Sequence, residues 1–115
     1  MTLEFFRKHC MKKPGFSEDL PFGPDVLVFR VAGKMFALMD VNTFVSVNLK
    51  CDPERAIELR EQYPGITPGY HMNKQHWNTI LTDDTVPPKL LLELVDHSYE
   101  LVRDSLPKKL REGLV

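Results

Sequence analysis

The amino-acid sequence predicts an α+β fold, in which an antiparallel β-sheet carries the terminal helices on one face. Apolar and polar residues alternate along 44–50, and Leu27, Phe29 and Val31 occupy every second position of 26–31, as in strands with one buried face. Near both ends of the chain, segments 3–12 and 87–106 place apolar residues at helical spacing instead. The length of 115 residues, with 43% hydrophobic and 27% charged residues, suits a single domain over 1–115.

The first helix is predicted over residues 3–12. Thr2 is suited to cap its N-terminus, and the sequence KKPG at 12–15 places cations and a helix-breaking proline at its C-terminal end. Its apolar face is formed by Leu3, Phe6 and Cys10. We expect residues 16–25 to begin as a short extended piece and to continue as a loop, because proline and glycine recur near its end.

Two strands are predicted over 26–31 and 34–39, joined by a tight hairpin at Ala32-Gly33, and a further strand is predicted over 44–50. The alternation assigns their two faces. The face predicted to be core carries Leu27, Phe29, Val31, Val45, Val47 and Leu49. The opposite face, which we expect to be wet and available for binding, carries Arg30, Ser46, Asn48 and Lys50.

A second helix is predicted within 51–65, with Asp52 and Pro53 at its start and Pro64-Gly65 at its end. A last long helix is predicted to start at Pro87 or Pro88. Its apolar stripe consists of Leu91, Leu94, Val95, Ser98, Val102 and Leu106, and Leu110 is the expected anchor of the short helix or tail that follows.

The strand predicted at 76–82 follows the stretch PGYHMNKQHWNTI, at 68–80, which concentrates hydrogen-bonding and aromatic groups. We predict a loop here, turned by Pro68 and Gly69, at the rim of the open sheet face. The pattern of the strand leaves open whether Trp77 and Leu81 or Ile80 face the core.

The net charge of −1 means that any nucleic-acid site must be a local basic patch, because phosphate binding depends on positive charge. No apolar run approaches the roughly 20 residues that a membrane helix needs. The N-terminus also lacks the pattern of a signal peptide, so the cytoplasm is the expected location. Cys10 and Cys51 are expected to be free thiols.

Three segments carry a resemblance to a known family: LPFGPDVLVFRVAGKMFAL, VNLKCDPERAIELREQYPGITPGYHMNKQHWNTI and LVDHSYELV. On these, nearly the whole chain resembles the MmcQ/YjbR family of small bacterial proteins. The resemblance implies a frataxin-like (CyaY-like) fold with terminal helices on one face of an antiparallel sheet. It also implies DNA binding through a double wing of sheet and loops, and it supplies no catalytic residue to transfer.

The open sheet face and its loops are therefore the predicted DNA-binding surface, and a protein partner is the alternative occupant of the same surface. Its cations would meet phosphates, and Trp77 would stack a base or anchor a protein. Solvated charges and a core tryptophan would give the same sequence pattern. The candidate residues are Arg30, Lys34, Lys50, His71, Lys74, His76 and Trp77.

Neither a metal site nor an enzymatic activity is predicted, and we expect a monomer without a cofactor. His71 and His76 lack the spacing of a zinc pair, and no cluster of cysteines or carboxylates completes a site. Cys51 follows Lys50 and precedes a helix, which favours a thiolate. Asp52 opposes this effect, and no histidine is placed by the sequence to act as a base.

Overall fold

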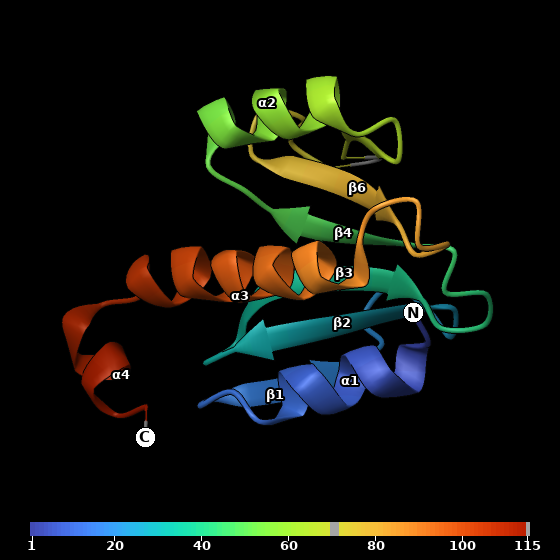
Figure 1. The fold of residues 1–115 in the computed structure, drawn as a ribbon. Helices are drawn as coiled ribbons and strands as arrows, with labels where there is room; N and C mark the ends of the chain where they lie inside the picture. The colour runs from blue at the N-terminus through green and yellow to red at the C-terminus, as the bar shows by residue number, and fades with distance from the viewer. Residues whose placement is uncertain (70–71, 115) are drawn as a thin grey trace.

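The computed structural model describes residues 1–69 and 72–114 (Figure 1). Within this part of the chain, no helix is both long and apolar enough to cross a membrane. In chain order the elements are α1 (Leu3–Met11), β1 (Phe16–Asp19), β2 (Val26–Val31), β3 (Lys34–Asp40), β4 (Ser46–Lys50), α2 (Pro53–Gln62), β5 (Ile66–Pro68), β6 (Trp77–Leu81), α3 (Pro88–Asp104) and α4 (Lys108–Glu112).

The strands form one six-stranded antiparallel sheet in the order β1-β2-β3-β4-β6-β5, which confirms the predicted α+β class (Figure 1). Strand β5 is absent from the sequence-based prediction. Its three residues are too few to show a period. Its proline, Pro68, is tolerated because β5 lies at the edge of the sheet.

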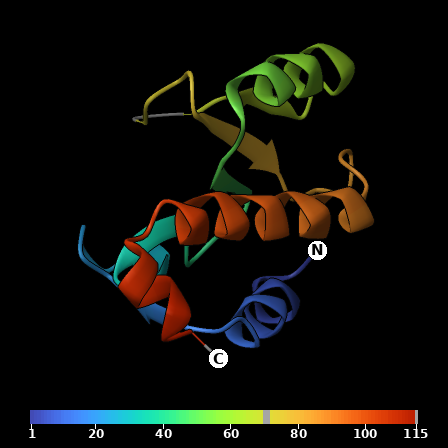
Figure 2. The same ribbon diagram turned by 90° about the vertical axis from the view of Figure 1, so that its left-hand side faces the viewer.

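Helices α1, α2 and α3 bury their apolar residues in one cluster against one face of the sheet, and Figure 2 shows α1 and α2 on the same side of the strands. Phe29, Val47, Leu94 and Val102 lie together in this cluster, as predicted. Among the described residues, no helix contributes to the smaller apolar cluster on the other face. We call that other side the open face; its strand residues include Val26, Val28, Arg30, Met35, Leu38, Asp40, Ser46, Asn48, Lys50, Trp77, Thr79 and Leu81.

Ser98 joins helix α3 to two strands of the sheet. Its side chain is fully buried, and its Oγ donates a hydrogen bond to the carbonyl oxygen of Phe36 (2.6 Å). The same oxygen accepts a hydrogen bond from the backbone N–H of Lys50 (2.9 Å). The hydroxyl thereby provides hydrogen-bond partners for two backbone groups, the carbonyl of Phe36 and the N–H of Lys50. These bonds fix the end of β4, where Lys50 lies.

The predicted helix caps and hairpin are confirmed. Thr2 accepts a hydrogen bond from the N–H of Phe5 (3.1 Å), and Asp52 accepts one from the N–H of Arg55 (3.1 Å). Ala32 and Gly33 both have positive φ angles, of 47° and 86°. This pair of angles is typical of the type I′ turn that suits a two-residue hairpin.

The prediction for the start of β4 is wrong by two residues. The strand begins at Ser46, and Val45, predicted to be core, is 60% exposed. The cause is Phe44, which adopts a φ of 44°, so the alternation of the strand does not extend back through it. Burial of the Phe44 ring against Phe6, with ring centroids 5.5 Å apart, offsets this unfavourable backbone conformation.

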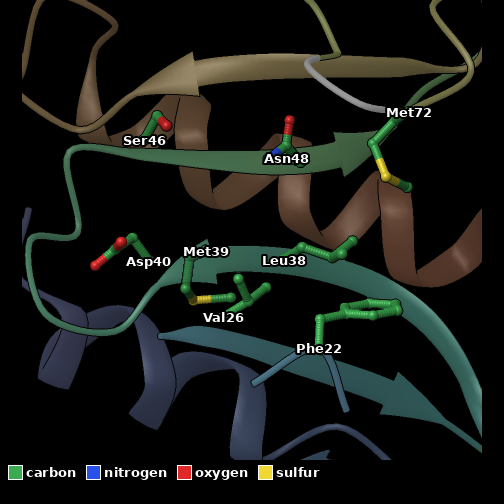
Figure 3. A pocket seen from close by; sticks show the side chains of 8 residues that line it. All are labelled: Phe22, Val26, Leu38, Met39, Asp40, Ser46, Asn48 and Met72. Carbon is green, nitrogen blue, oxygen red and sulfur yellow. The ribbon is translucent and has the colours of Figure 1, made fainter. Parts of the chain in front are cut away.

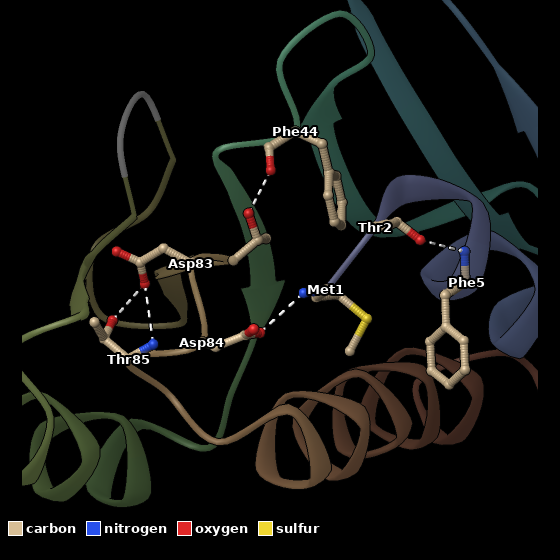
Figure 4. A network of polar contacts seen from close by, with 8 residues as sticks. Met1, Thr2, Phe5, Phe44, Asp83, Asp84 and Thr85 are labelled. Atoms are coloured by element: carbon tan, nitrogen blue, oxygen red, sulfur yellow. Dashed lines mark hydrogen bonds and ion pairs between the residues drawn. The ribbon is translucent and has the colours of Figure 1, made fainter.

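Hydrogen bonds hold the β6–α3 connection beside this turn (Figure 4). The buried Thr82 hydroxyl donates to the carbonyl oxygen of Phe44, and Asp83 accepts from both the N–H and the hydroxyl of Thr85. The amino group of Met1 is 2.9 Å from Oδ1 of Asp84. These polar contacts thus hold the N-terminus, the turn at Phe44 and the β6–α3 connection together at one end of the sheet.

The C-terminal segment packs differently from the prediction. Leu110, the expected anchor, is 50% exposed on the short helix α4. Leu114 packs against the core instead, beside Gly15. The short turn of α4 leaves too few residues for an apolar stripe, so periodicity does not identify the anchoring side chain.

Candidate functional site

Trp77 lies on the open face, which decides the alternative that the sequence leaves open. In β6, Trp77 pairs with Lys50, whereas Ile80 pairs with Val47 and belongs to the helix-side core. The indole is nevertheless only 8% exposed, because it packs against Val28 and Leu38. The open face is therefore partly apolar, and the prediction of a wet face holds for only part of it.

The chain before β6 approaches this tryptophan closely at Gly69. The N–H of Gly69 donates to the carbonyl oxygen of Trp77 (2.8 Å). A Cβ atom at position 69 would lie 2.8 Å from the Cβ of Trp77, which is closer than real Cβ contacts allow. Position 69 therefore requires glycine, so that the backbone can approach Trp77 closely. This contact holds residue 69 against β6 beside the open face.

A groove of about 420 Å³ lies on the open face beside this cluster (Figure 3). Its size is within the range of small-ligand sites, which are mostly apolar with a few polar groups. Phe22 and Met72 lie at one end, and Asp40 and Ser46 at the other. The groove is lined by Phe22, Val26, Leu38, Met39, Asp40, Ser46, Asn48 and Met72.

The polar groups of the groove have distinct hydrogen-bonding capacities. Asn48 accepts a hydrogen bond at Oδ1 from the Thr79 hydroxyl (2.6 Å), which leaves its Nδ2 as a donor. Asp40 accepts at Oδ1 from the backbone N–H groups of Asn42 (2.8 Å) and Thr43 (3.0 Å). The hydrogen bonds from Thr43, and secondarily from Asn42, lower the pKa of the Asp40 carboxyl, so this end of the groove is anionic at neutral pH.

Two of the predicted cations lie on the open face, at the end of the sheet nearer the Ala32-Gly33 hairpin. Arg30 is half-buried; its Nε donates to Oδ1 of Asp19 (2.9 Å), and its Nη1 donates to the carbonyl oxygen of Gly33 (3.0 Å). Lys50 is also half-buried, and its side chain makes no ion pair within the described residues. The expectation that both are exposed is therefore wrong.

Lys34 and Lys74 do not join these two cations on the open face. Lys34 pairs with Val31, a residue of the helix-side core, so it points away from the open face at the hairpin. Lys74 is exposed and lines a shallow depression together with residues of α2. His76 is half-buried, and His71 lies outside the described residues.

Arg60 of α2 explains the position of Lys74. Its Nη2 donates to the carbonyl oxygen of Lys74 (2.6 Å), and its Nε donates to Oδ1 of the buried Asn78 (2.7 Å). The backbone preceding β6 is thus tied to the helix side of the sheet. A lysine in a polar loop gives no sequence signal for such a contact.

The groove residues Phe22, Asp40 and Met72 are missing from the sequence-based candidates, although the sequence places Ser46 and Asn48 on the binding face. Phe22 lies between proline and glycine residues, where an aromatic residue is a weak sequence signal, and the structure leaves it 61% exposed. Asp40 and Met72 are unremarkable in sequence. Only the fold brings the loops of residues 20–25 and 72–76 beside the same strands.

The thiols lie in surroundings that disfavour the thiolate. Burial raises the pKa of the Cys51 thiol, and it raises the pKa of the Cys10 thiol to about 12. Neither residue forms a disulfide. In residues 1–69 and 72–114, no three His, Cys, Asp or Glu side chains are grouped so that they could hold a metal ion.

Comparisons with known proteins find small bacterial relatives. The YjbR family model matches residues 11–101. Protein YbdF of Escherichia coli O157:H7 is 40% identical over 90 residues, covering 77% of this chain and 74% of its own. Protein YjbR of Escherichia coli K12 is 34% identical over 116 residues, covering 100% and 98%, respectively.

Solved structures agree with this fold. The crystal structure of Deinococcus radiodurans protein DR2400 has a TM-score of 0.91 and 40% identity, covering 97% of this chain and 86% of that chain. A Pseudomonas syringae protein has a TM-score of 0.75 and 32% identity, covering 89% and 99%.

Proposed function

Since the chain belongs to the YjbR family, we propose that it is a non-catalytic DNA-binding protein that uses the open face of its sheet. The observation that carries the proposal is the groove together with the cations beside it. Lys50 follows Asn48 by two residues on β4, which places it about 7 Å further along the strand. Arg30 lies toward the same end of the sheet.

This arrangement supplies the two parts that a nucleic-acid surface needs. The half-buried Lys50 side chain would contact phosphates. Arg30 would contribute less to phosphate binding, because it is already paired with Asp19. The apolar groove with its amide and hydroxyl groups would contact the less polar part of a nucleotide. Because Arg30 and Lys50 are the two candidate cations that the described part of the chain places on this face, binding is expected to be weak and to depend modestly on salt.

The loops of residues 20–25 and 72–76 project on the side of the sheet opposite α1 and α2 (Figure 2). We infer that these two loops are the wings of a double-wing surface in a CyaY-like fold. In this account the protein is a cytoplasmic monomer, and the wings close the groove around the bound strand at Phe22 and Met72.

A protein partner on the same face is the second candidate. Phe22, at the rim of the groove, is 61% exposed, and the nearby Leu20 is 47% exposed. Exposed apolar side chains beside a groove are typical of protein interfaces. A protein held by these side chains would bind with little dependence on salt, whereas DNA would be released as salt rises.

The test compares two lysine variants by fluorescence anisotropy with a mixed-sequence oligonucleotide. Lys50→Gln is expected to weaken binding about five- to tenfold, as the loss of one charge-assisted contact does. Lys89→Gln is the matched control, because Lys89 is an exposed lysine on α3, away from the open face. For the wild type, a plot of log K against log[salt] is expected to have a slope of about −0.7 to −1.4 for one or two contacts with a single strand. Equal loss in both variants, or no binding by the wild type, would overturn the proposal.

A further inference from the structure

We infer that the groove takes one unpaired base of a single strand, and that it prefers adenine or cytosine over thymine. This inference rests on the proposed function and adds to it the kind of strand and the kind of base. It follows from the shape of the groove, from its rim and from the order of its hydrogen-bonding groups.

The shape of the groove selects a single strand. The groove, of about 420 Å³, lies between the loops that carry Phe22 and Met72, and Val26 and Leu38 are among the apolar residues that line it (Figure 3). In a duplex, each base is stacked and paired, so its flat apolar surface is not available to such a groove. A single strand can place one base flat against apolar side chains, with the exposed ring of Phe22 beside it.

The order of polar groups selects the edge of the base. Asn48 offers Nδ2 as a donor, since its Oδ1 already accepts from Thr79. Asp40 offers its second carboxylate oxygen as an acceptor, since its Oδ1 holds the turn that follows β3. Ser46 lies at the same end of the groove as Asp40 and can donate or accept (Figure 3). The groove therefore presents an anionic acceptor at one end and a donor in its middle.

Adenine and cytosine each carry an amino group next to a ring-nitrogen acceptor, which matches this acceptor and donor. Thymine carries a carbonyl in place of the amino group and would bring that oxygen toward the carboxylate of Asp40. The phosphate would lie toward Lys50, two residues beyond Asn48 on β4. Phosphate and carboxylate are thereby kept at opposite ends, which is the charge arrangement that a nucleotide requires.

The test measures binding of labelled oligo-dA, oligo-dC and oligo-dT strands of about twelve nucleotides, and of the dA·dT duplex, at one low salt concentration. We expect oligo-dA and oligo-dC to bind at least about fivefold more tightly than oligo-dT, which corresponds to about 1 kcal/mol. The duplex is expected to bind more weakly than oligo-dA.

Asp40→Asn is the decisive variant, because its carboxamide keeps an oxygen for the N–H groups of Asn42 and Thr43 and can also donate to a carbonyl. A thermal melt checks that the variant is folded. The preference over oligo-dT is expected to fall below about twofold, as the carboxylate no longer repels the carbonyl. Strands bound without base preference, a duplex bound as well as oligo-dA, or a preference unchanged in Asp40→Asn would overturn this inference alone. Failure to bind any strand would overturn the proposed function as well.

Discussion

Replacing Trp77 with alanine tests whether the open face is held together by its own small apolar cluster. A tryptophan side chain buries roughly 200 Å², and Trp77 retains only 8% exposure. At about 25 cal/mol per Å² this burial gives about 5 kcal/mol, and a compact unfolded state reduces that by 10–40%. We therefore expect Trp77→Ala to lower the free energy of unfolding by about 3–5 kcal/mol, the range found for large core deletions.

Urea unfolding followed by far-ultraviolet circular dichroism measures this loss without relying on the tryptophan signal. Phe22→Ala is the matched control, because it removes an aromatic ring from the same face that is 61% exposed. The control is expected to cost less than about 0.5 kcal/mol. A loss below about 1 kcal/mol in Trp77→Ala would show that the indole is not buried against Val28 and Leu38.

Three further changes probe contacts in other parts of the fold. Ser98→Ala leaves two buried backbone groups unsatisfied and is expected to cost about 2–4 kcal/mol in the same urea assay, and an unchanged midpoint would contradict it. Gly69→Ala should shift the tryptophan emission and lower the melting temperature, because its Cβ has no room; wild-type emission and stability would argue against that close contact. Burial of Asp96 tends to raise the pKa of its carboxyl, but hydrogen bonds and charges from Lys13 and His9 together outweigh burial, so the folded-state pKa is lowered. The stabilisation is therefore present above the unfolded-state pKa of about 3.9 and is lost as the pH falls through the lower folded-state pKa. For this partly exposed group it should amount to no more than about 1 kcal/mol, and acid titrations of stability should be flatter in Asp96→Asn than in the wild type.

The helices and most of the strands follow from the sequence because their signals are local. Asp52 and Pro53 mark the start of α2 independently of the rest of the fold, and Ala32-Gly33 specifies its hairpin. The predicted start of β4 fails at Phe44 because a positive φ at an aromatic residue is imposed by tertiary packing. Local periodicity carries no information on that packing.

The candidate site is predictable only in part, for a related reason. Alternation correctly places Arg30, Ser46, Asn48 and Lys50 on the face opposite the helices. It does not reveal that Asp19 pairs with Arg30, because that contact depends on the register between β1 and β2. The apolar groove depends on which loops reach the same strands, and this is decided by the order of strands in the sheet.

Nuclear magnetic resonance with a labelled protein and a mixed-sequence single strand tests the central claim most directly, because it locates the bound strand on the molecule. We expect the resonances of the backbone amides of Ser46, Asn48 and Lys50 and of the indole N–H of Trp77 to shift on titration at low salt. The resonances of amides in α1, on the opposite side of the sheet, should not shift. Shifts confined to the helices, or no shifts at all, would contradict the claim that the open face binds DNA.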